Sequence, residues 1–215
     1  MPYLNLEKEY SNRGVNPYRF QAILENAGSS ILDIGCGSGA YVLELAHQYK
    51  IRGIDFQYFE SWNDNPELFS ISDAVEINFP DNSVDTILSF ETLEHLADPE
   101  KALRQYHRVC RKNLILTVPN CYITPGMRQS LVTYYHWIDR THVNFFSMDS
   151  ITELVQASGF RISKKYYINQ ISWIPLLLEA FDFSTFLGKL AKKILCNLPH
   201  KDYYITCLIV AEKNN

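Results

Sequence analysis

The sequence predicts an α/β protein with a parallel sheet, and two observations support this class. Short apolar stretches typical of buried strands recur along the chain, at 30–34, 51–55, 68–72, 84–90 and 113–118. Segments with helical spacing of apolar residues lie between some of them, at 41–46 and 99–110. Strands that alternate with helices are joined by crossovers, and they therefore pair in parallel.

Length and composition fit one globular domain. The chain has 215 residues, of which 47% are hydrophobic and 20% charged, and its formal net charge is −4. A chain of this length buries a stable core without disulfides or a structural metal. The 5 cysteines include no C-x-x-C pair, so a zinc finger is not expected. A weakly acidic chain has no basic surface for the phosphates of a nucleic-acid duplex, and we expect no duplex partner.

No targeting segment is visible. The apolar runs are far shorter than the roughly 20 residues that a membrane-spanning helix needs. The first residues, MPYLNLEKEY, lack the basic start and the apolar region of a secretory signal. We therefore expect a cytoplasmic protein.

The single domain is expected to span residues 1–215 with three additions to the sheet. Residues 1–28 form an N-terminal cap, whose helix at 18–26 ends before Gly28. Helical insertions are expected at about 120–146 and 171–200. The remaining elements are a helix at 147–158 and strands at 161–168 and 203–211.

A glycine turn joins the first strand to the first helix. Gly35, Gly37 and Gly39 stand at alternate positions in this turn. Glycine tolerates a positive φ and lets the backbone approach a ligand, while the following helix directs its N–H groups at that ligand. Together with Ala40 the turn also fits the dinucleotide pattern G-x-G-x-x-G/A, so a nicotinamide enzyme is an alternative.

Three acids follow three strands and favour a different ligand. Asp33 comes just before the glycines, where a carboxylate would repel a pyrophosphate but attract an ammonium group. Asp55 ends the second strand, where α/β sheets place an acid for ribose hydroxyls. Asp73 follows the third strand and can accept a proton from an exocyclic amine. An ammonium group, a ribose and an adenine in this order describe S-adenosylmethionine.

The motif series resembles that of class I S-adenosylmethionine-dependent methyltransferases, and among them the small-molecule group of the ubiquinone-pathway O-methyltransferases. The matching segments are ILDIGCGSGAY, IRGIDF, SISDAVEINFPDNSVDTILSFETLEHLADP, LILTVPN and the late F-S-x-x-x-x-x-E-L-V-x-x-x-G-F, over about 29–160 plus the last strand. The resemblance implies a Rossmann-like three-layer sandwich around a seven-stranded sheet with an antiparallel last strand. It implies cofactor-binding roles for Asp33, Gly35, Cys36, Gly37, Gly39, Asp55, Phe56, Asp73, Ala74 and Ser89.

The segment after the fourth strand reads E-x-x-E-H, with Glu91, Glu94 and His95. If it turns helical, these three residues share one face. The run is similar to one in ubiquinone-pathway O-methyltransferases and small-RNA 2′-O-methyltransferases, where it holds a divalent cation. His142 is the candidate fourth ligand, and magnesium or manganese is the expected ion. The alternative is that Glu94 and His95 form local hydrogen bonds beside the active cleft without a metal.

Methyl transfer needs alignment and, when the acceptor oxygen carries a proton, a base. Histidine is the natural base near neutral pH, so the candidate catalytic residues are His142, His95 and Glu94, with His136 as a further base. Tyr134, Tyr135 and Trp137 offer an aromatic wall for an acceptor.

The sequence therefore predicts an S-adenosylmethionine-dependent methyltransferase that acts on a small-molecule acceptor at oxygen. The alternatives are a metal-assisted RNA 2′-O-methyltransferase, a non-catalytic S-adenosylmethionine-binding partner protein and a nicotinamide dehydrogenase. Residues 171–200 combine apolar and basic residues, and they are expected to form a lid, a homodimer contact or a peripheral membrane contact.

Overall fold

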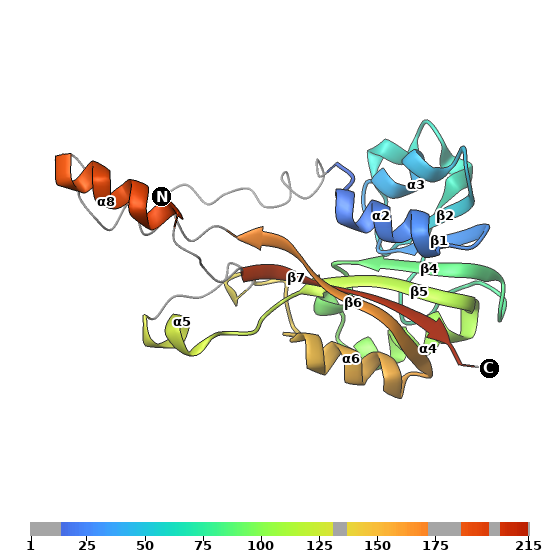
Figure 1. Ribbon diagram of the computed structural model, residues 1–215. Helices are drawn as coiled ribbons and strands as arrows, with labels where there is room; N and C mark the ends of the chain where they lie inside the picture. Colours follow the sequence, from blue (N-terminus) through green and yellow to red (C-terminus); the bar gives the residue numbers. More distant parts are fainter. Residues whose placement is uncertain (1–13, 131–136, 172–185, 198–202, 215) are drawn as a thin grey trace.

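The structure is a computed structural model, and it describes residues 14–130, 137–171, 186–197 and 203–214 (Figure 1). Its centre is a seven-stranded sheet in the order β3-β2-β1-β4-β5-β7-β6. The strands are β1 (Ser30–Ile34), β2 (Lys50–Asp55), β3 (Phe69–Ile71), β4 (Val84–Phe90), β5 (Cys110–Pro119), β6 (Phe160–Ile171) and β7 (Tyr203–Lys213). Strands β1 to β5 pair in parallel, and β7 lies antiparallel between β5 and β6. Both the parallel sheet and the antiparallel last strand are confirmed.

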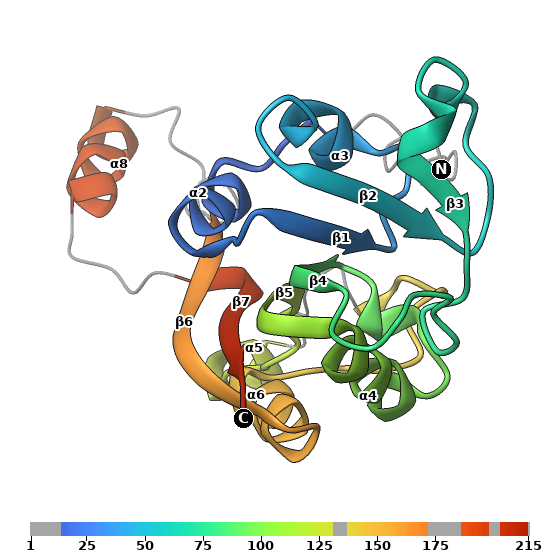
Figure 2. The same ribbon diagram turned by 90° about the vertical axis from the view of Figure 1, so that its right-hand side faces the viewer.

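Helices cover both faces of the sheet (Figures 1 and 2). On one face lie α2 (Pro17–Asn26) and α3 (Ala40–Leu45), and on the other lie α4 (Pro99–Val109) and α6 (Met148–Ala157). The start of α4 is set by Asp98, whose side chain accepts a hydrogen bond from the Lys101 N–H. A capping box between Ser147 and Ser150 starts α6 in the same way.

The core lies where the helices pack on the central strands. Every residue of β4 is buried, as expected for a parallel strand covered on both faces. Leu32, Ile34 and Ile87 pack toward α4 and α6, whereas Ile31 and Leu88 pack toward α2 and α3. This packing fixes the carboxyl ends of β1, β2 and β4 at one edge of the sheet.

Two short turns replace a helix between β2 and β3. They are the 3₁₀ turns η1 (Glu60–Trp62) and η2 (Pro66–Leu68). The last two strands run longer than the sequence predicts, because β6 and β7 pair with each other up to Ile171 and Tyr203. The described parts of the two predicted insertions contain α5 (Pro125–Gln129) and α8 (Phe186–Asn197). Within the described residues no helix has both the length and the apolar composition to span a membrane.

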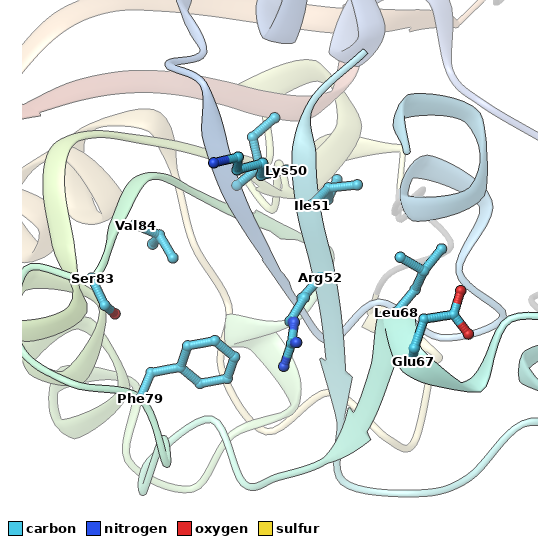
Figure 3. Close-up of a pocket in the computed structure, with 9 residues that line it drawn as sticks. Lys50, Ile51, Arg52, Glu67, Leu68, Phe79, Ser83 and Val84 are labelled. Carbon is cyan, nitrogen blue, oxygen red and sulfur yellow. The ribbon is translucent and has the colours of Figure 1, made fainter. Parts of the chain in front are cut away.

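The opposite, amino edge of the sheet carries a separate hollow of about 550 Å³ (Figure 3). Lys50, Arg52 and Glu67 line it together with the ring of Phe79. None of the predicted site residues lies in this hollow. The candidate site is therefore built at the carboxyl edge.

Candidate functional site

The glycine turn has the conformation that the sequence predicts. Gly35, Gly37 and Gly39 have φ values of +72°, +52° and +84°. A Cβ on Gly35 would lie 2.4 Å from the Thr92 side chain, so this position admits only glycine. A Cβ on Gly37 would meet nothing within 4 Å, so this residue faces open space. The turn thus leaves room for a ligand beside its backbone.

Asp33 and Asp55 lie at the ends of β1 and β2, next to this turn. Asp33 is only 2% exposed. Its burial, followed by the charge of Asp55, raises the pKa of the Asp33 carboxyl to about 7, against an opposing effect of Arg19. Asp55 accepts hydrogen bonds from the N–H groups of Gly37 (2.9 Å) and Gln57 (3.3 Å), but burial still raises its pKa. The two acids are thus brought together as predicted.

A cavity of about 840 Å³ opens beside Asp55, while the buried Asp33 is not part of its lining. Its lining includes five of the predicted cofactor residues, namely Gly35, Asp55, Phe56, Asp73 and Ala74. The Phe56 ring is 75% exposed and is thus available to a flat ligand. Glu91, His95 and Thr141 line the same cavity. The predicted cofactor and catalytic regions therefore share one space.

The other five predicted cofactor residues, Asp33, Cys36, Gly37, Gly39 and Ser89, do not line this cavity. Ser89 is buried in β4, and its Oγ lies 3.3 Å from the hydroxyl oxygen of Tyr106. Cys36 is half-buried within the turn, and burial raises the pKa of its thiol. Neither side chain lines the cavity. A contact of these two residues with a cofactor remains a prediction.

The sequence analysis missed Arg19, which lies on α2. Its guanidinium forms an ion pair with Glu91 and lies 5.3 Å from the ring centre of Phe90. The Arg19 Nε is buried and has no hydrogen-bond partner among the described residues. The sequence contained one signal that Arg19 faces the interior. Arg19 precedes the buried Ile23 by four positions and therefore shares its face of the helix.

The condition for a shared helical face of Glu91, Glu94 and His95 is not met, because Glu91 lies outside the helical turn. The helical part is the single 3₁₀ turn η3 (Leu93–His95), and Glu91 lies before it with a φ of +52°. The ion pair with Arg19 turns Glu91 toward α2. Glu91 therefore does not belong to the group of metal-ligand type that the structure brings together.

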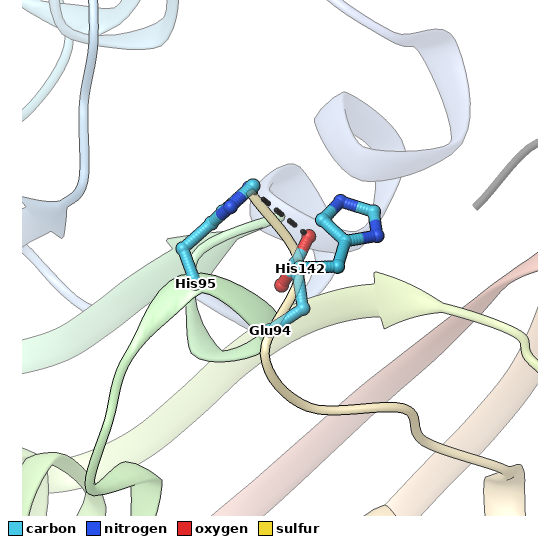
Figure 4. A group of neighbouring side chains, drawn as sticks. All are labelled: Glu94, His95 and His142. Carbon is cyan, nitrogen blue, oxygen red and sulfur yellow. Dashed lines mark ion pairs between the residues drawn. The ribbon is translucent and has the colours of Figure 1, made fainter. Parts of the chain in front are cut away.

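That group consists of Glu94, His95 and His142, whose ligand atoms all lie within 4.8 Å of one another (Figure 4). The Nε2 atom of His95 is 3.9 Å from Glu94 Oε1, and its Nδ1 is 3.1 Å from the carbonyl oxygen of Thr141. The rings of His95 and His142 meet edge to face with centres 4.8 Å apart. All three predicted catalytic residues thus lie together.

Glu94 is 1% exposed, and neither carboxylate oxygen has a hydrogen-bond partner within the described part of the chain. Burial, followed by the charge of Glu91, raises the pKa of Glu94 well above its usual value. An unsatisfied buried carboxyl is costly for a fold, and such groups concentrate at functional sites. Glu94 is therefore a buried carboxyl whose charged form the described residues do not stabilise.

His142 does not line the cavity that His95 lines. It is 7% exposed, and its Nε2 is 3.5 Å from Oδ2 of Asp139, a residue that the sequence analysis did not single out. The signal for Asp139 was its position three residues before a candidate histidine.

The other predicted residues of this loop are only partly described. His136, Tyr134 and Tyr135 lie outside the described residues. Trp137 stacks on Phe145 with ring centres 4.4 Å apart.

Comparison with known families shows which protein family this chain belongs to. A family model described as a methyltransferase domain matches residues 12–165, which is more than half of the chain. The chain belongs to this methyltransferase family. The resemblance to class I S-adenosylmethionine-dependent methyltransferases is thereby confirmed.

Curated relatives match this chain over parts of their length. It is 30% identical to a phosphatidylethanolamine N-methyltransferase of Cereibacter sphaeroides over 49% of this chain and 57% of that protein. It is 29% identical to a 27-O-demethylrifamycin SV methyltransferase of Amycolatopsis mediterranei over 46% of this chain and 41% of that protein. The chain thus spans about half the length of these relatives.

Solved structures share the fold of this methyltransferase at low sequence identity. The YcgJ protein of Bacillus subtilis has a TM-score of 0.63 and 17% identity, with 93% of this chain and all of that chain covered. Phosphoethanolamine N-methyltransferase 2 of Haemonchus contortus, solved with S-adenosyl-L-methionine, has a TM-score of 0.61 and 17% identity, with 93% and 53% covered. At such identities the likeness shows the fold alone.

The residues of this methyltransferase fit S-adenosylmethionine on structural grounds. Among the described residues, Arg19 is the cation whose charge acts on the buried Asp33, and the backbone at Gly37 faces open space. The orphaned donor on Arg19 suits a carboxylate, while Asp33 suits an ammonium group. The residues present thus fit the two charged groups of the cofactor's methionine part.

Proposed function

We propose that this protein transfers a methyl group from S-adenosylmethionine to a hydroxyl oxygen of a small-molecule acceptor. The observation that carries the proposal is the position of the buried Asp33 at the end of β1, next to the glycine turn, with Asp55 and Asp73 on the wall of the cavity at the same ends of the strands. An ammonium group would stabilise the charged form of Asp33, which its burial disfavours. A nicotinamide cofactor would instead place a pyrophosphate there.

We assign the cofactor contacts as follows. Asp33 and Arg19 hold the ammonium and carboxylate groups, and the backbone of Gly35, Gly37 and Gly39 cradles the chain between them. Asp55 accepts the ribose hydroxyls, because its carboxylate already lies within reach of the turn through Gly37. Asp73, Ala74 and Phe56 surround the adenine. Bound in this way, S-adenosylmethionine supplies a methyl carbon that is activated by the sulfonium.

His95 is the residue best placed to act as base. It lines the cavity, whereas the buried His142 does not. The carbonyl of Thr141 accepts a hydrogen bond from Nδ1, which leaves Nε2 to take the proton. In the proposed step the acceptor oxygen bonds to the methyl carbon, the carbon–sulfur bond breaks, and the hydroxyl proton moves to Nε2.

Glu94, His142 and Asp139 support this base in the proposal. A positive charge on His95 would lie 3.9 Å from Glu94 Oε1, where a carboxylate stabilises it. The His142 ring holds His95 from the side, and Asp139 in turn orients His142. The sequence-based prediction that His142 itself is the base remains the alternative within this site.

A divalent cation is a second candidate for this cluster. Glu94, His95 and His142 offer one carboxylate and two imidazoles within 4.8 Å of one another, which suits manganese or magnesium with water as further ligands. Such an ion would lower the pKa of an acceptor hydroxyl. The hydrogen bond of His95 to Thr141 also fits a ligand histidine, whose second nitrogen is normally held by such a partner.

An oxygen acceptor is favoured by the site and by the names of relatives. The base beside the cavity serves a nucleophile that carries a proton, such as a hydroxyl. Matched relatives include O-methyltransferases of Aspergillus nomiae and Pyrenophora dematioidea, and N-methyltransferases also occur among them.

The proposal also covers location and organisation. It includes cytoplasmic residence and a single domain over residues 1–215. It further includes contact of residues 171–200 with a second copy of the chain or with a membrane.

Calorimetric titration with S-adenosylmethionine tests the cofactor. We expect binding in the micromolar range that is weakened by Arg19→Met and unchanged by Arg140→Met, a control on an exposed arginine. Absence of binding by the folded protein would overturn the proposal. A labelled methyl-transfer screen across metabolite extracts, with and without EDTA, then identifies the acceptor class and decides between the base and the metal.

A further inference from the structure

Helix α8 carries apolar and basic side chains that are both exposed. Leu190 and Ile194 are 49% and 53% exposed. Because they are four residues apart, they lie on the same face of the helix. Lys189, Lys192 and Lys193 are exposed as well, and their spacing of three and four places them together on a separate face. The helix is therefore amphipathic, and the named side chains of both its apolar and its basic face are exposed.

The position of α8 leaves this apolar face available. Figures 1 and 2 both show the helix well away from the seven-stranded sheet. The catalytic site also makes no use of it, since no residue of α8 lines the cavity in front of Asp55. Two half-exposed aliphatic side chains, one turn apart, therefore form an apolar stripe on a helix that lies apart from the sheet.

Charge indicates what covers this surface. The segment 186–197, FLGKLAKKILCN, holds three lysines and no acid, whereas the whole chain has a net charge of −4. The helix is thus basic in an acidic protein. A surface that pairs apolar contact with attraction for anions is complementary to the headgroup region of an anionic bilayer.

We propose that α8 binds the surface of membranes that contain anionic lipids. Leu190 and Ile194 enter the boundary between headgroups and acyl chains, with the helix axis parallel to the membrane plane. The long side chains of Lys189, Lys192 and Lys193 reach the phosphates from the side of the helix. A single short helix gives weak, reversible attachment that decreases as salt screens the lysines.

A second copy of the chain suits the surface less well. A helix of 12 residues is about 18 Å long, so a stripe of about 10 Å in width offers on the order of 200 Å². Stable dimers bury about 800 Å² on each partner. Two copies packed through α8 would also bring their lysines together, and like charges repel.

Vesicle flotation of the full chain tests the inference. We compare vesicles of phosphatidylcholine alone with vesicles that contain about one third phosphatidylglycerol, at low and high salt. The parent should float with the anionic vesicles at low salt, and at least ten-fold less protein should float with neutral vesicles or at high salt. Two variants remove the proposed contacts. One carries Leu190→Glu with Ile194→Glu, and the other changes Lys189, Lys192 and Lys193 to Gln. The amount of each variant that floats with anionic vesicles at low salt should be at least ten-fold lower than for the parent.

Matched controls carry equal changes elsewhere on the surface. Leu24→Glu alters an exposed leucine on α2, and the change of Lys50, Lys101 and Lys165 to Gln removes the same charge. Both should float like the parent. Failure of the parent to float, or equal loss in the controls, would overturn the inference. A dimer in sedimentation that Leu190→Glu with Ile194→Glu dissociates would also overturn it, in favour of a second copy.

This inference goes beyond the proposed methyl transfer, and the two fail separately. Titration with S-adenosylmethionine contains no lipid, so the α8 variants should bind the cofactor as the parent does. Loss of flotation with cofactor binding intact therefore concerns α8 alone.

Discussion

A buried aspartate lies at each end of the parallel strands, and the surroundings shift the pKa values of these two aspartates in opposite directions. At the amino edge, Asp85 accepts hydrogen bonds from Ser29 and Ser30 and lies 3.1 Å from Arg111. Burial alone would raise its pKa, but Ser29, Lys112 and Arg111 together hold the pKa at about 2. At the carboxyl edge, burial and a neighbouring acid raise the pKa of Asp33 to about 7.

The difference separates an acid whose charge the fold itself satisfies from an acid that, in the proposed function, the cofactor's ammonium group completes. Asp85 ties the start of β1 to β4 and β5, so the protein itself supplies the donors and cations that its charge needs. Asp33 and Glu94 are buried at the edge that carries the cavity, and their charged forms are left under-satisfied. Such groups reduce stability, and their presence is understandable where a substrate or cofactor completes them.

The largest effect is expected at the base. His95→Ala should lower turnover on the identified acceptor by about 10² to 10⁴, the range for a positioned base. Affinity for S-adenosylmethionine should stay close to that of the parent, because His95 lies beyond the cofactor acids. Steady-state kinetics and calorimetry measure the two effects, and His47→Ala, on an exposed histidine, is the control.

His142→Ala separates the two versions of the catalytic step. If His142 only supports His95, its loss should cost less turnover than the loss of His95. A larger loss for His142→Ala would restore His142 as the base. If a metal is held, both variants and EDTA should abolish turnover, with recovery of the parent by added manganese or magnesium.

Asp33→Asn should weaken S-adenosylmethionine about 100-fold, because it removes one partner of a buried charge pair. In the parent, a carboxyl with a pKa of about 7 is largely protonated at pH 6, and the cofactor's ammonium group favours its charged form. Binding at pH 6 should therefore release a proton, and affinity should rise between about pH 5 and 7. Calorimetry in two buffers of different ionisation enthalpy detects this proton. Equal heats in both buffers would contradict the role of Asp33.

The same acid should also shape the stability of the free protein. The pKa of Asp33 is higher in the folded chain than in the unfolded one, where it is about 3.9. The unfolded state therefore loses this proton first, and the free energy of unfolding should fall as pH rises from about 4 to 7. Asp33→Asn should flatten this part of the stability profile.

Asp55→Ala should weaken the cofactor by about 1.5 to 3 kcal/mol, because the ribose hydroxyls lose a charged acceptor. The acid contributes little to the core, so thermal melting should match the parent. Asp64→Ala, on an exposed aspartate outside the cavity lining, is the control. A variant that melts normally and binds normally would remove Asp55 from the site.

The glycine turn and the strand-end acids were predictable because each depends on local sequence. A strand, a turn and a helix in succession place Asp33 and Gly35 relative to each other without any knowledge of distant packing. The parallel order of the strands then brings Asp55 and Asp73 to the same edge. These residues and the sheet itself followed from patterns within short windows of the chain.

Arg19 and Glu91 were not predictable in the same way. Their ion pair joins residues 72 positions apart, and it exists only because α2 packs beside the end of β4. The positive φ of Glu91 breaks the helical spacing on which the E-x-x-E-H prediction depended. The pairing of β6 with β7 beyond the rest of the sheet likewise results from contact between distant segments.

The smallest expected effect is at the amino edge and concerns stability alone. Asp85→Asn keeps the shape of the side chain but removes the charge that Arg111 and Lys112 face, and it should lower the free energy of unfolding by about 1 to 2 kcal/mol at pH 7. The parent's pKa of about 2 lies below the unfolded value of about 3.9. Its contribution is thus present above about pH 4 and lost as pH falls toward 2, whereas the variant should show no such loss. Denaturant unfolding between pH 2 and 7 measures both, with the exposed Asp81→Asn as control. Unchanged cofactor affinity in Asp85→Asn would sharpen the contrast between the two edges, and a weakened affinity would show that they are coupled through β1 and β4.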